Sequence, residues 1–211
     1  MESLQINEVQ ISDLRQSLDF EIFSDKRRQH ILNVEKCAIE LGKIFLPREV
    51  IKLQAAALLH DITKELPSEE QIRIAEEYGA PFSEDERMCP KIFHARTAAL
   101  VIPKKYPQFA DPDIISAVAK HTTGDASFSM FEKIIFLADF MEEGRTYEIC
   151  RSVREDFFGH LPKNENELQA YLDQTVLKVL DATILILVRE KTYIAEQTFR
   201  CRNRLLAKTS I

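Results

Sequence analysis

The chain contains 211 residues, of which 45% are hydrophobic, and its formal net charge is −6. This length and apolar content suffice for one large domain with its own core. The acidic charge argues against a protein that coats nucleic acid, because binding to the phosphate backbone requires clustered basic residues. Only 5 glycines and no tryptophan are present, and Ala, Leu, Ile, Glu and Lys fill long stretches, which predicts an all-α protein.

No apolar run is long enough to span a bilayer, and the first 25 residues lack the apolar core of a signal peptide. We therefore expect a cytoplasmic protein. The cysteines lie far apart and form no CxxC pair, which predicts reduced thiols that mostly pack in the interior. They are Cys37, Cys89, Cys150 and Cys201.

The first half of the chain predicts an extension followed by two long helices. Residues 1–23 form the extension and include a weakly amphipathic stretch with Leu14, Leu18 and Ile22. Ser24 and Asp25 offer capping oxygens to a helix over residues 26–45. Its inner face is expected to carry Ile31, Val34, Ala38, Leu41 and Phe45. Segment 50–59 is apolar on nearly all sides, which predicts a central, buried helix.

Capping boxes predict three further helix starts, because a serine at each start is followed three residues later by a glutamine or glutamate that can bond back. They are Ser68 with Gln71, Ser83 with Glu86, and Ser129 with Glu132. Proline opens two more helices. Pro90 precedes the helix that contains His94, after an irregular entry, and Asp111-Pro112 opens the helix that ends near His121.

The remaining helices complete a count of about nine or ten. Segment 130–143 contains Asp139, and Asn164 with Glu167 starts a long helix that runs to about residue 190. A final basic helix is expected over residues 195–207. Because no repeat or linker divides the chain, we expect a single domain over residues 24–208.

Six side chains that can bind a metal fall at helix ends or on helix faces, and they are His30, His60, Asp61, His94, His121 and Asp139. A single histidine on an apolar helix is more often a core or surface residue than a ligand. The set is more informative, because His60 and Asp61 directly follow the most apolar helix. An unpaired polar group there would cost a few kcal/mol, and a divalent metal would compensate for it.

The ligand types favour a hydrolytic metal centre. Nitrogen and oxygen ligands without cysteine suit iron, manganese, cobalt, nickel or zinc, and they argue against a sulfur-rich structural zinc site. Six candidates exceed the three or four ligands that one catalytic metal usually takes from the protein. Two metals bridged by the Asp61 carboxylate, with a metal-bound hydroxide as nucleophile, are therefore expected.

The same residues resemble the H…HD…D signature of the HD-domain phosphohydrolase superfamily, in which His94 and His121 match the extra histidines of the dinuclear members. More narrowly, the chain resembles the bacterial HD-domain symmetrical diadenosine tetraphosphate hydrolases. The matching segments are Arg27-x-x-His30, His60-Asp61-Ile62-Thr63-Lys64, His121-Thr122-Thr123-Gly124, Lys133 to Asp139, Glu143-Gly144-Arg145 and Thr198 to Asn203. The last resembles that family's C-terminal nucleotide-contact segment, although Cys201 stands where the family has alanine.

The resemblance implies an HD-type helical bundle with a diiron-type site that cuts diadenosine tetraphosphate into two ADP. One metal would be bound by His30, His60, Asp61 and Asp139, and the other by Asp61, His94 and His121. Catalytic roles fall to Asp61, His94 and Lys64. The implied substrate contacts are Arg27, Lys64, His94, Thr122, Gly124, Lys133, Arg145, Thr198, Arg202 and Asn203. C-terminal helices would close the nucleotide site, and a homodimer is compatible with such helical surfaces.

Each substrate contact also has an ordinary structural explanation. Lys64 lies three residues after Asp61 and Arg27 three before His30, which favours a shared face, yet both could be solvated cations. Gly124 could simply end a helix, and Lys133 could pair with a surface carboxylate. The fifth histidine, His160, has no counterpart in the cluster and is expected to be a loop residue.

Three other functional classes remain open at this stage. Another HD-type nucleotidase could act on a nucleoside monophosphate or a guanosine polyphosphate, because the superfamily shares its metal ligands. A catalytically silent ligand-binding module typically lacks several of these ligands, whereas all six are present here. A structural helical adaptor would not need His and Asp at the end of a buried helix.

Overall fold

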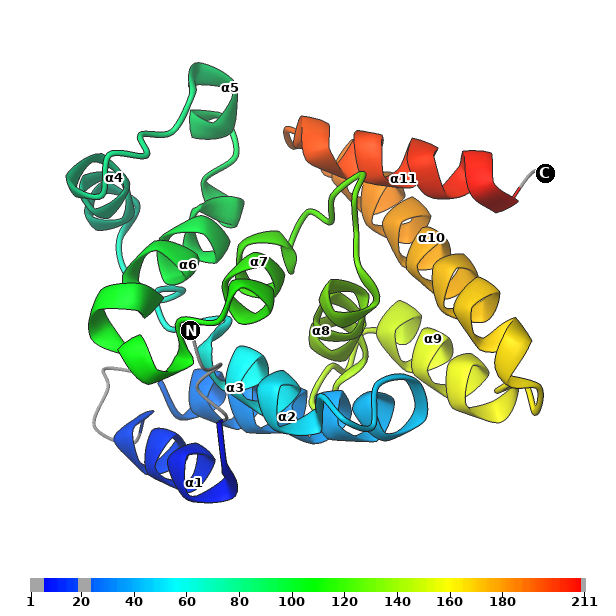
Figure 1. Cartoon of the computed structure of the whole chain (residues 1–211). Helices are drawn as coiled ribbons and strands as arrows, with labels where there is room; N and C mark the ends of the chain where they lie inside the picture. Colours follow the sequence, from blue (N-terminus) through cyan, green and yellow to red (C-terminus); the bar gives the residue numbers. More distant parts are fainter. Residues whose placement is uncertain (1–5, 19–23, 210–211) are drawn as a thin grey trace.

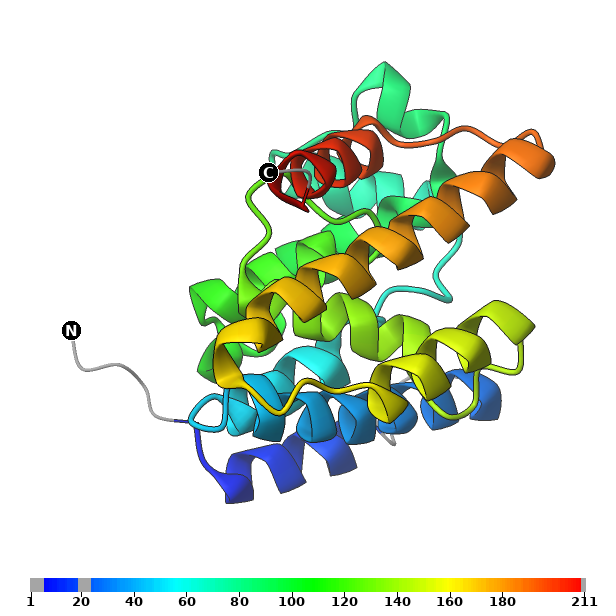
Figure 2. The same cartoon turned by 90° about the vertical axis from the view of Figure 1, so that its right-hand side faces the viewer.

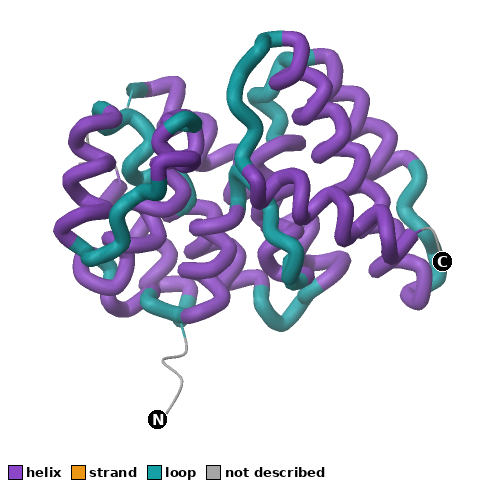
Figure 3. The backbone as a smooth tube through the Cα atoms, turned by 90° about the horizontal axis from the view of Figure 1, so that it is seen from above, coloured by secondary structure: helices purple, strands orange, loops and turns teal. Residues whose placement is uncertain are grey.

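The computed structural model describes residues 6–18 and 24–209, which contain eleven α-helices and no strand (Figures 1 and 3). The all-α prediction is confirmed. The helices are α1 (Glu8–Ser17), α2 (Asp25–Phe45), α3 (Val50–Leu59), α4 (Ser68–Glu77), α5 (Glu84–Arg87), α6 (Phe93–Lys105), α7 (Pro112–Lys120), α8 (Met130–Met141), α9 (Glu148–Gly159), α10 (Glu165–Arg189) and α11 (Glu196–Thr209). Short 3₁₀ turns, η2 (Pro90–Ile92) and η3 (Pro107–Phe109), precede and follow α6.

Helix α3 lies at the centre of the core, as its apolar sequence predicts. Residues 53–59 are all buried, and α3 packs against α1, α2, α7 and α8. The predicted inner face of α2 is also buried. A Cβ atom added at Gly42 of α2 would lie 2.7 Å from Leu53 Cδ1 of α3. Glycine therefore allows the two helices to approach closely at this point.

Helix α1, which the sequence suggests is an extension, belongs to the same core as the rest of the chain. Ile11 and Leu14 are buried in it, and Asn7 forms a capping box with Gln10. Arg15 donates two hydrogen bonds to the buried carboxylate of Glu35 on α2, at 3.0 and 2.5 Å. Although it precedes the boundary expected at residue 24, α1 therefore packs against the core. Ile22 lies outside the described residues.

Replacement of Leu14 by alanine is expected to lower the free energy of unfolding by about 2–4 kcal/mol, because this side chain is 2% exposed and its loss leaves a cavity. The matched control is Val9→Ala on the same helix, where the side chain is 68% exposed and a change within about 0.5 kcal/mol is expected. Urea denaturation measures both. Equal midpoints for the two variants would mean that α1 does not contribute to the core.

All three helix starts predicted from capping boxes are confirmed, because α4, α5 and α8 begin at or directly after the serines, but only two of the three boxes form. Ser83 and Ser129 each accept from the backbone three residues on, and the glutamate there bonds back. The box at Ser68 is wrong, because Pro67 occupies the N-cap position and the amide of Gln71 donates to the Leu66 carbonyl instead. Pro67, as the N-cap residue, already has the extended backbone that a capping serine would otherwise provide.

The C-terminal helices cover one side of the bundle. Figure 2 shows the long α10 crossing α8 and α9, with α11 returning along α10 after a short loop. That loop begins at Lys191, whose φ of 55° is in the left-handed region. No described helix combines the length and the apolarity required to cross a bilayer. All four cysteines are free, and Cys89 is the only one that is not buried.

Candidate active site

Two histidines occupy the same structural position at the ends of two helices. His60 is the C-cap of α3 and His121 the C-cap of α7. The Nδ1–H of His60 donates to the Ala57 carbonyl at 2.6 Å, and that of His121 to the Val118 carbonyl at 2.7 Å. Each ring therefore has its Nε2 lone pair free, and the two rings lie edge to face with centroids 4.9 Å apart.

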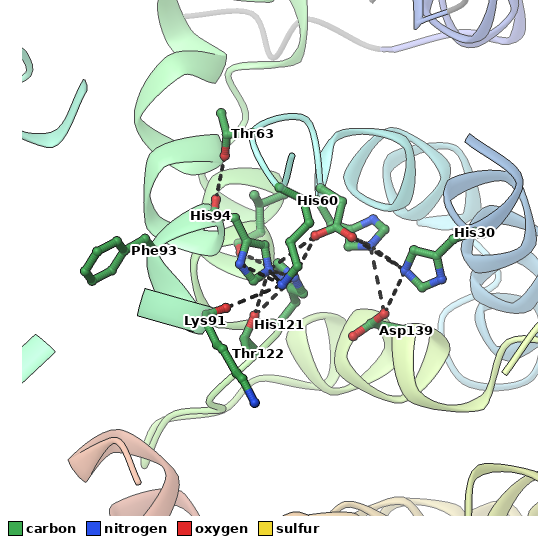
Figure 4. Close-up of polar contacts among 12 residues, drawn as sticks. His30, His60, Thr63, Lys91, Phe93, His94, His121, Thr122 and Asp139 are labelled. Atoms are coloured by element: carbon green, nitrogen blue, oxygen red, sulfur yellow. Dashed lines mark hydrogen bonds and ion pairs between the residues drawn. The ribbon is translucent and has the colours of Figure 1, made fainter. Parts of the chain in front are cut away.

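Three further side chains reach the same point from other helices (Figure 4). His30 comes from α2, His94 from the first turn of α6, and Asp139 from the last turns of α8. The Thr63 hydroxyl donates to the His94 carbonyl at 2.9 Å. This bond ties the start of α6 to the turn that follows α3, so the two segments hold a fixed relative position.

Asp61 lies between two sets of histidines. Its Oδ2 is 3.4 Å from His60 Nε2 and 3.6 Å from His30 Nε2, whereas its Oδ1 is 3.2 Å from His94 Nε2 and 3.6 Å from His121 Nε2. One carboxylate thus presents a different oxygen to each half of the cluster. A bridging carboxylate requires this arrangement.

The residues fit a divalent metal. Ligand atoms within 4.8 Å of one another form two groups that share His60: His30, His60 and Asp139, and His60, Asp61 and His121. Among the described residues, Asp61 Oδ1 is buried without a well-directed hydrogen bond, and a cation would compensate for it. His94 is in neither group, although its Nε2 is 3.1 Å from that of His121. These ligand types bind several divalent metals, so the donor set alone does not select iron.

The electrostatics of the cluster suit metal ligands. Burial would raise the pKa of Asp61, but the surrounding histidines outweigh it and hold the pKa well below its ordinary value. Burial lowers the pKa values of His60 and His94. At neutral pH these groups are therefore a carboxylate and neutral imidazoles, which are the forms that bind metals. His30 differs, because hydrogen bonds to Asp139 and Glu142 outweigh burial and raise its pKa to about 9.

Three of the predicted phosphate-binding cations surround the cluster. The Arg27 guanidinium donates to Asp61 Oδ2, and Arg145 donates to Asp139 Oδ1 at 2.5 Å and to the Asp139 carbonyl at 3.0 Å. Lys64 Nζ is 3.1 Å from His94 Nδ1, and burial lowers its pKa. The chain does not continue as a helix after Asp61, yet its turns still bring Lys64 to the cluster.

A partly open cavity of about 370 Å³ adjoins the cluster. Thr122 lines it, and the Thr122 hydroxyl is also 3.2 Å from the Nε2 atoms of both His94 and His121. Lys91 lines it as well, and its carbonyl accepts from Lys64 Nζ at 3.4 Å. The remaining lining residues are Met88, Cys89, Pro90, Ile92, Thr123, Thr183, Leu187, Thr192, Tyr193, Ala195 and Thr198. Of the predicted substrate contacts, Thr122 and Thr198 therefore share this cavity.

Other predicted contacts lie elsewhere. Lys133 is 2% exposed, and its ammonium donates to Asp173 of α10 at 2.5 Å, so the geometry does not favour a substrate contact. Arg202 bonds to Asp181 at 2.6 Å and lines a separate groove together with Asn203. Gly124 has a φ of +68° and packs against Cys201, where an added Cβ would lie 2.8 Å from Sγ.

Two results concern histidine and glutamate residues outside the six candidates. His160 is 74% exposed and pairs with Asp156, away from the cluster, at the end of α9. Glu142 was missed in the sequence analysis. This residue is buried, and its carboxylate lies 3.1 Å from His30 Nδ1. Its position directly before the Glu143-Gly144-Arg145 segment is the only sequence signal that could have indicated it.

Buried histidines and aspartates at the centre of a helical bundle fit a metal-dependent hydrolase. The model of the family described as "HD domain" matches residues 27–184, and the chain therefore belongs to the HD domain family. All six candidate ligands lie within the matched residues. Membership confirms the resemblance seen in the sequence and the enzyme class, a metal-dependent hydrolase.

The chain is also similar to individual proteins whose descriptions are more specific than that of the family. The chain is 27% identical over 179 residues to "Bis(5'-nucleosyl)-tetraphosphatase, symmetrical" of Staphylococcus aureus. The aligned residues make up 85% of this chain and 86% of the relative. It is also 27% identical to the protein of that name in Bacillus subtilis, over 87% of this chain and 91% of the relative. A crystal structure from Clostridium acetobutylicum, described as a "predicted HD superfamily hydrolase involved in NAD metabolism", has 25% sequence identity and a TM-score of 0.80, and covers 93% of this chain and 97% of that one.

Proposed function

We propose that the protein hydrolyses diadenosine tetraphosphate, or a closely related dinucleoside polyphosphate, into two nucleoside diphosphates. The observation that carries this proposal is the Asp61 carboxylate, whose two oxygens face separate halves of a buried His/Asp cluster beside a cavity. The names of the similar proteins from Staphylococcus aureus and Bacillus subtilis support the choice of substrate.

The side chains around the cluster supply the positive charge that a polyphosphate needs. Arg27, Lys64 and Arg145 all lie within hydrogen-bonding distance of cluster residues, so phosphate oxygens bound there would be neutralised from three sides. Arginine can hold two oxygens of one phosphate at once, whereas lysine offers a point charge. These contacts would align the central anhydride bond with the cluster.

The adjoining cavity is proposed to hold one nucleoside. Its volume of about 370 Å³ is within the usual range for small-ligand pockets. Apolar side chains such as Ile92 and Leu187 would cover the faces of a base, and hydroxyls such as those of Thr183 and Thr198 could bond to polar edges. Because Thr122 contacts both the cavity and the cluster, a nucleoside bound here would extend its phosphates toward Asp61.

We propose two divalent metals, with iron as the first candidate and manganese, cobalt, nickel or zinc as alternatives. His30, His60 and Asp139 would hold one, His121 with His94 the other, and Asp61 would contact both. When bound, such metals would polarise phosphoryl oxygens and lower the pKa of a bound water to about 7. The residues of the chain would then neutralise the phosphate charge, orient the substrate and exclude bulk water.

The direct test is incubation of the purified protein, with its metal content measured, with diadenosine tetraphosphate and chromatography of the products. Two ADP and no other nucleotide are expected. ATP with AMP would contradict the symmetrical cut, and turnover of a nucleoside monophosphate or a guanosine polyphosphate alone would replace the substrate. No turnover and no bound metal would favour a ligand-binding module.

Bound ADP is expected to protect Cys89 from alkylation, because this thiol lines the cavity and is the only cysteine that is not buried. Labelling by N-ethylmaleimide, followed by mass spectrometry, should slow about tenfold when ADP is at ten times its Kd. Burial raises the pKa of Cys89, so mildly alkaline buffer is required. The Cys89→Ser variant should not be labelled under native conditions. An unchanged rate at saturating ADP would locate the nucleotide outside this cavity.

The cytoplasmic location, the single domain over residues 24–208 and the homodimer remain predictions. Sedimentation velocity at several protein concentrations tests the homodimer directly. The expected partner is a small nucleotide rather than a nucleic acid polymer or a membrane, in keeping with the net charge of −6.

A further inference from the structure

Glu142 is a buried carboxylate that no part of the proposed reaction uses. It follows α8 directly, as the C-cap residue, and is 3% exposed. Its Oε1 is 3.1 Å from His30 Nδ1, and its Oε2 accepts the backbone N–H of Gly144. The Asn33 side chain also donates to it. An ionised carboxylate only accepts hydrogen bonds, so all three groups must donate to Glu142.

This contact keeps a proton on Nδ1 of His30, so that a metal bound at Nε2 would displace only the proton shared with Asp139. Because Nδ1 donates to Glu142, the neutral ring has its lone pair on Nε2. That atom lies 3.0 Å from Asp139 and 3.4 Å from His60 Nε2, inside the cluster. Glu142 therefore presents the metal-binding nitrogen of His30 to the proposed site.

His30 differs in this respect from the two C-cap histidines. His60 and His121 are oriented by backbone carbonyls within their own helices, so no side-chain substitution can remove that support. The support of His30 comes from a side chain 112 residues away. One half of the cluster thus depends on Glu142 for its geometry, and the other half does not.

We propose that Glu142 is a positioning residue that fixes the tautomer and orientation of His30 for metal binding. The inference rests on the metal centre of the proposed function. Gly144 leaves room for this arrangement, because an added Cβ would lie 2.9 and 3.2 Å from the Glu142 oxygens and 2.7 Å from Asn33 Nδ2. A larger residue there would crowd both the Glu142 carboxylate and the Asn33 amide, and at least one of these side chains must shift.

Glu142→Gln tests the proposal with little change in shape. An amide has one oxygen and one NH₂ group, so either His30 Nδ1–H or the Gly144 N–H must face a donor. Gly144→Ala perturbs the same carboxylate by crowding. The matched control is Glu143→Gln, since this neighbouring glutamate is 65% exposed and pairs with Lys36.

The measurement is calorimetric titration of the metal-free full-length protein with Co²⁺ alone. Both test variants are expected to bind one equivalent about 10–100-fold more weakly, while the equivalent held by His94 and His121 and the Glu143→Gln control remain unchanged. Nitrogen-15 NMR of the imidazoles should show a slowly exchanging Nδ1–H of His30 in the zinc-loaded wild type, and this proton should exchange faster in zinc-loaded Glu142→Gln, where it has lost its carboxylate acceptor.

Three results would overturn the proposal: unchanged affinity in both test variants, equal weakening of both equivalents, or the same exchange rate of the His30 Nδ1–H in zinc-loaded Glu142→Gln as in the wild type. If Glu142→Gln does not fold, Gly144→Ala decides alone. Because no nucleotide is present, a wild type that binds Co²⁺ but does not cleave diadenosine tetraphosphate would contradict the proposed function and leave this inference standing.

Discussion

The Asp61→Ala variant is expected to lose about 10³-fold or more in kcat/KM for diadenosine tetraphosphate and to retain almost no bound metal. Both oxygens of this carboxylate lie within 3.6 Å of histidine nitrogens, one in each half of the cluster. Its loss also leaves Arg27 without its acceptor. Asp61 is the candidate ligand that presents a separate oxygen to each half of the cluster. Elemental analysis and a steady-state assay measure the two losses.

His160→Ala is the control, because this histidine is 74% exposed and lies outside the cluster. It should keep the wild-type metal content and rate. Circular dichroism of the metal-free Asp61→Ala protein must show an intact helical spectrum for the comparison to hold. An Asp61→Ala protein that folds, binds metal at wild-type stoichiometry and turns over substrate would refute the bridging role.

Lys133→Met is expected to destabilise the fold by about 3–5 kcal/mol while leaving the kcat of the folded enzyme unchanged. The substitution leaves Asp173 buried with Gln169 as its remaining donor, at 3.1 Å. The pair joins α8 to α10, and the Lys133 side chain is 3% exposed. Urea denaturation gives the stability, and a steady-state assay at low temperature gives the rate.

Two further variants test whether the expected loss of stability comes from leaving a buried charge unpaired. Lys133→Met with Asp173→Leu should recover most of the lost stability, because no unpaired charge remains. Lys178→Met removes an ion pair on the surface of α10, whose partners are 46% and 50% exposed, and should cost less than about 1 kcal/mol. A fall in kcat or a rise in KM for folded Lys133→Met would instead restore Lys133 as a substrate contact.

Local patterns in the sequence predicted the helices and the metal-binding residue types. An apolar inner face predicted α2, and apolar residues on nearly all sides predicted the buried α3, because a helix buries the faces that are apolar. Two capping boxes were correct, because such a box involves only four consecutive residues. The six His and Asp candidates could be chosen because ligand chemistry depends on residue type, and His60-Asp61 directly ends the most apolar helix.

Contacts between distant segments could not be predicted in this way. Glu142 and Glu143 are identical neighbours in the chain, yet the first is 3% exposed against His30 and the second is 65% exposed. Likewise, Lys64 and Lys133 were both predicted substrate contacts, but of the two only Lys64 reaches the cluster.

The sequence by itself thus determined that this is a helical protein with a His/Asp cluster of the HD type. The tertiary structure decided which side chains face that cluster, that α1 joins the core, and that Asp61 turns one oxygen to each half. The physical reason is that helix formation and ligand chemistry depend on nearby residues, whereas burial and pairing depend on which helices pack together, which is a property of the whole chain.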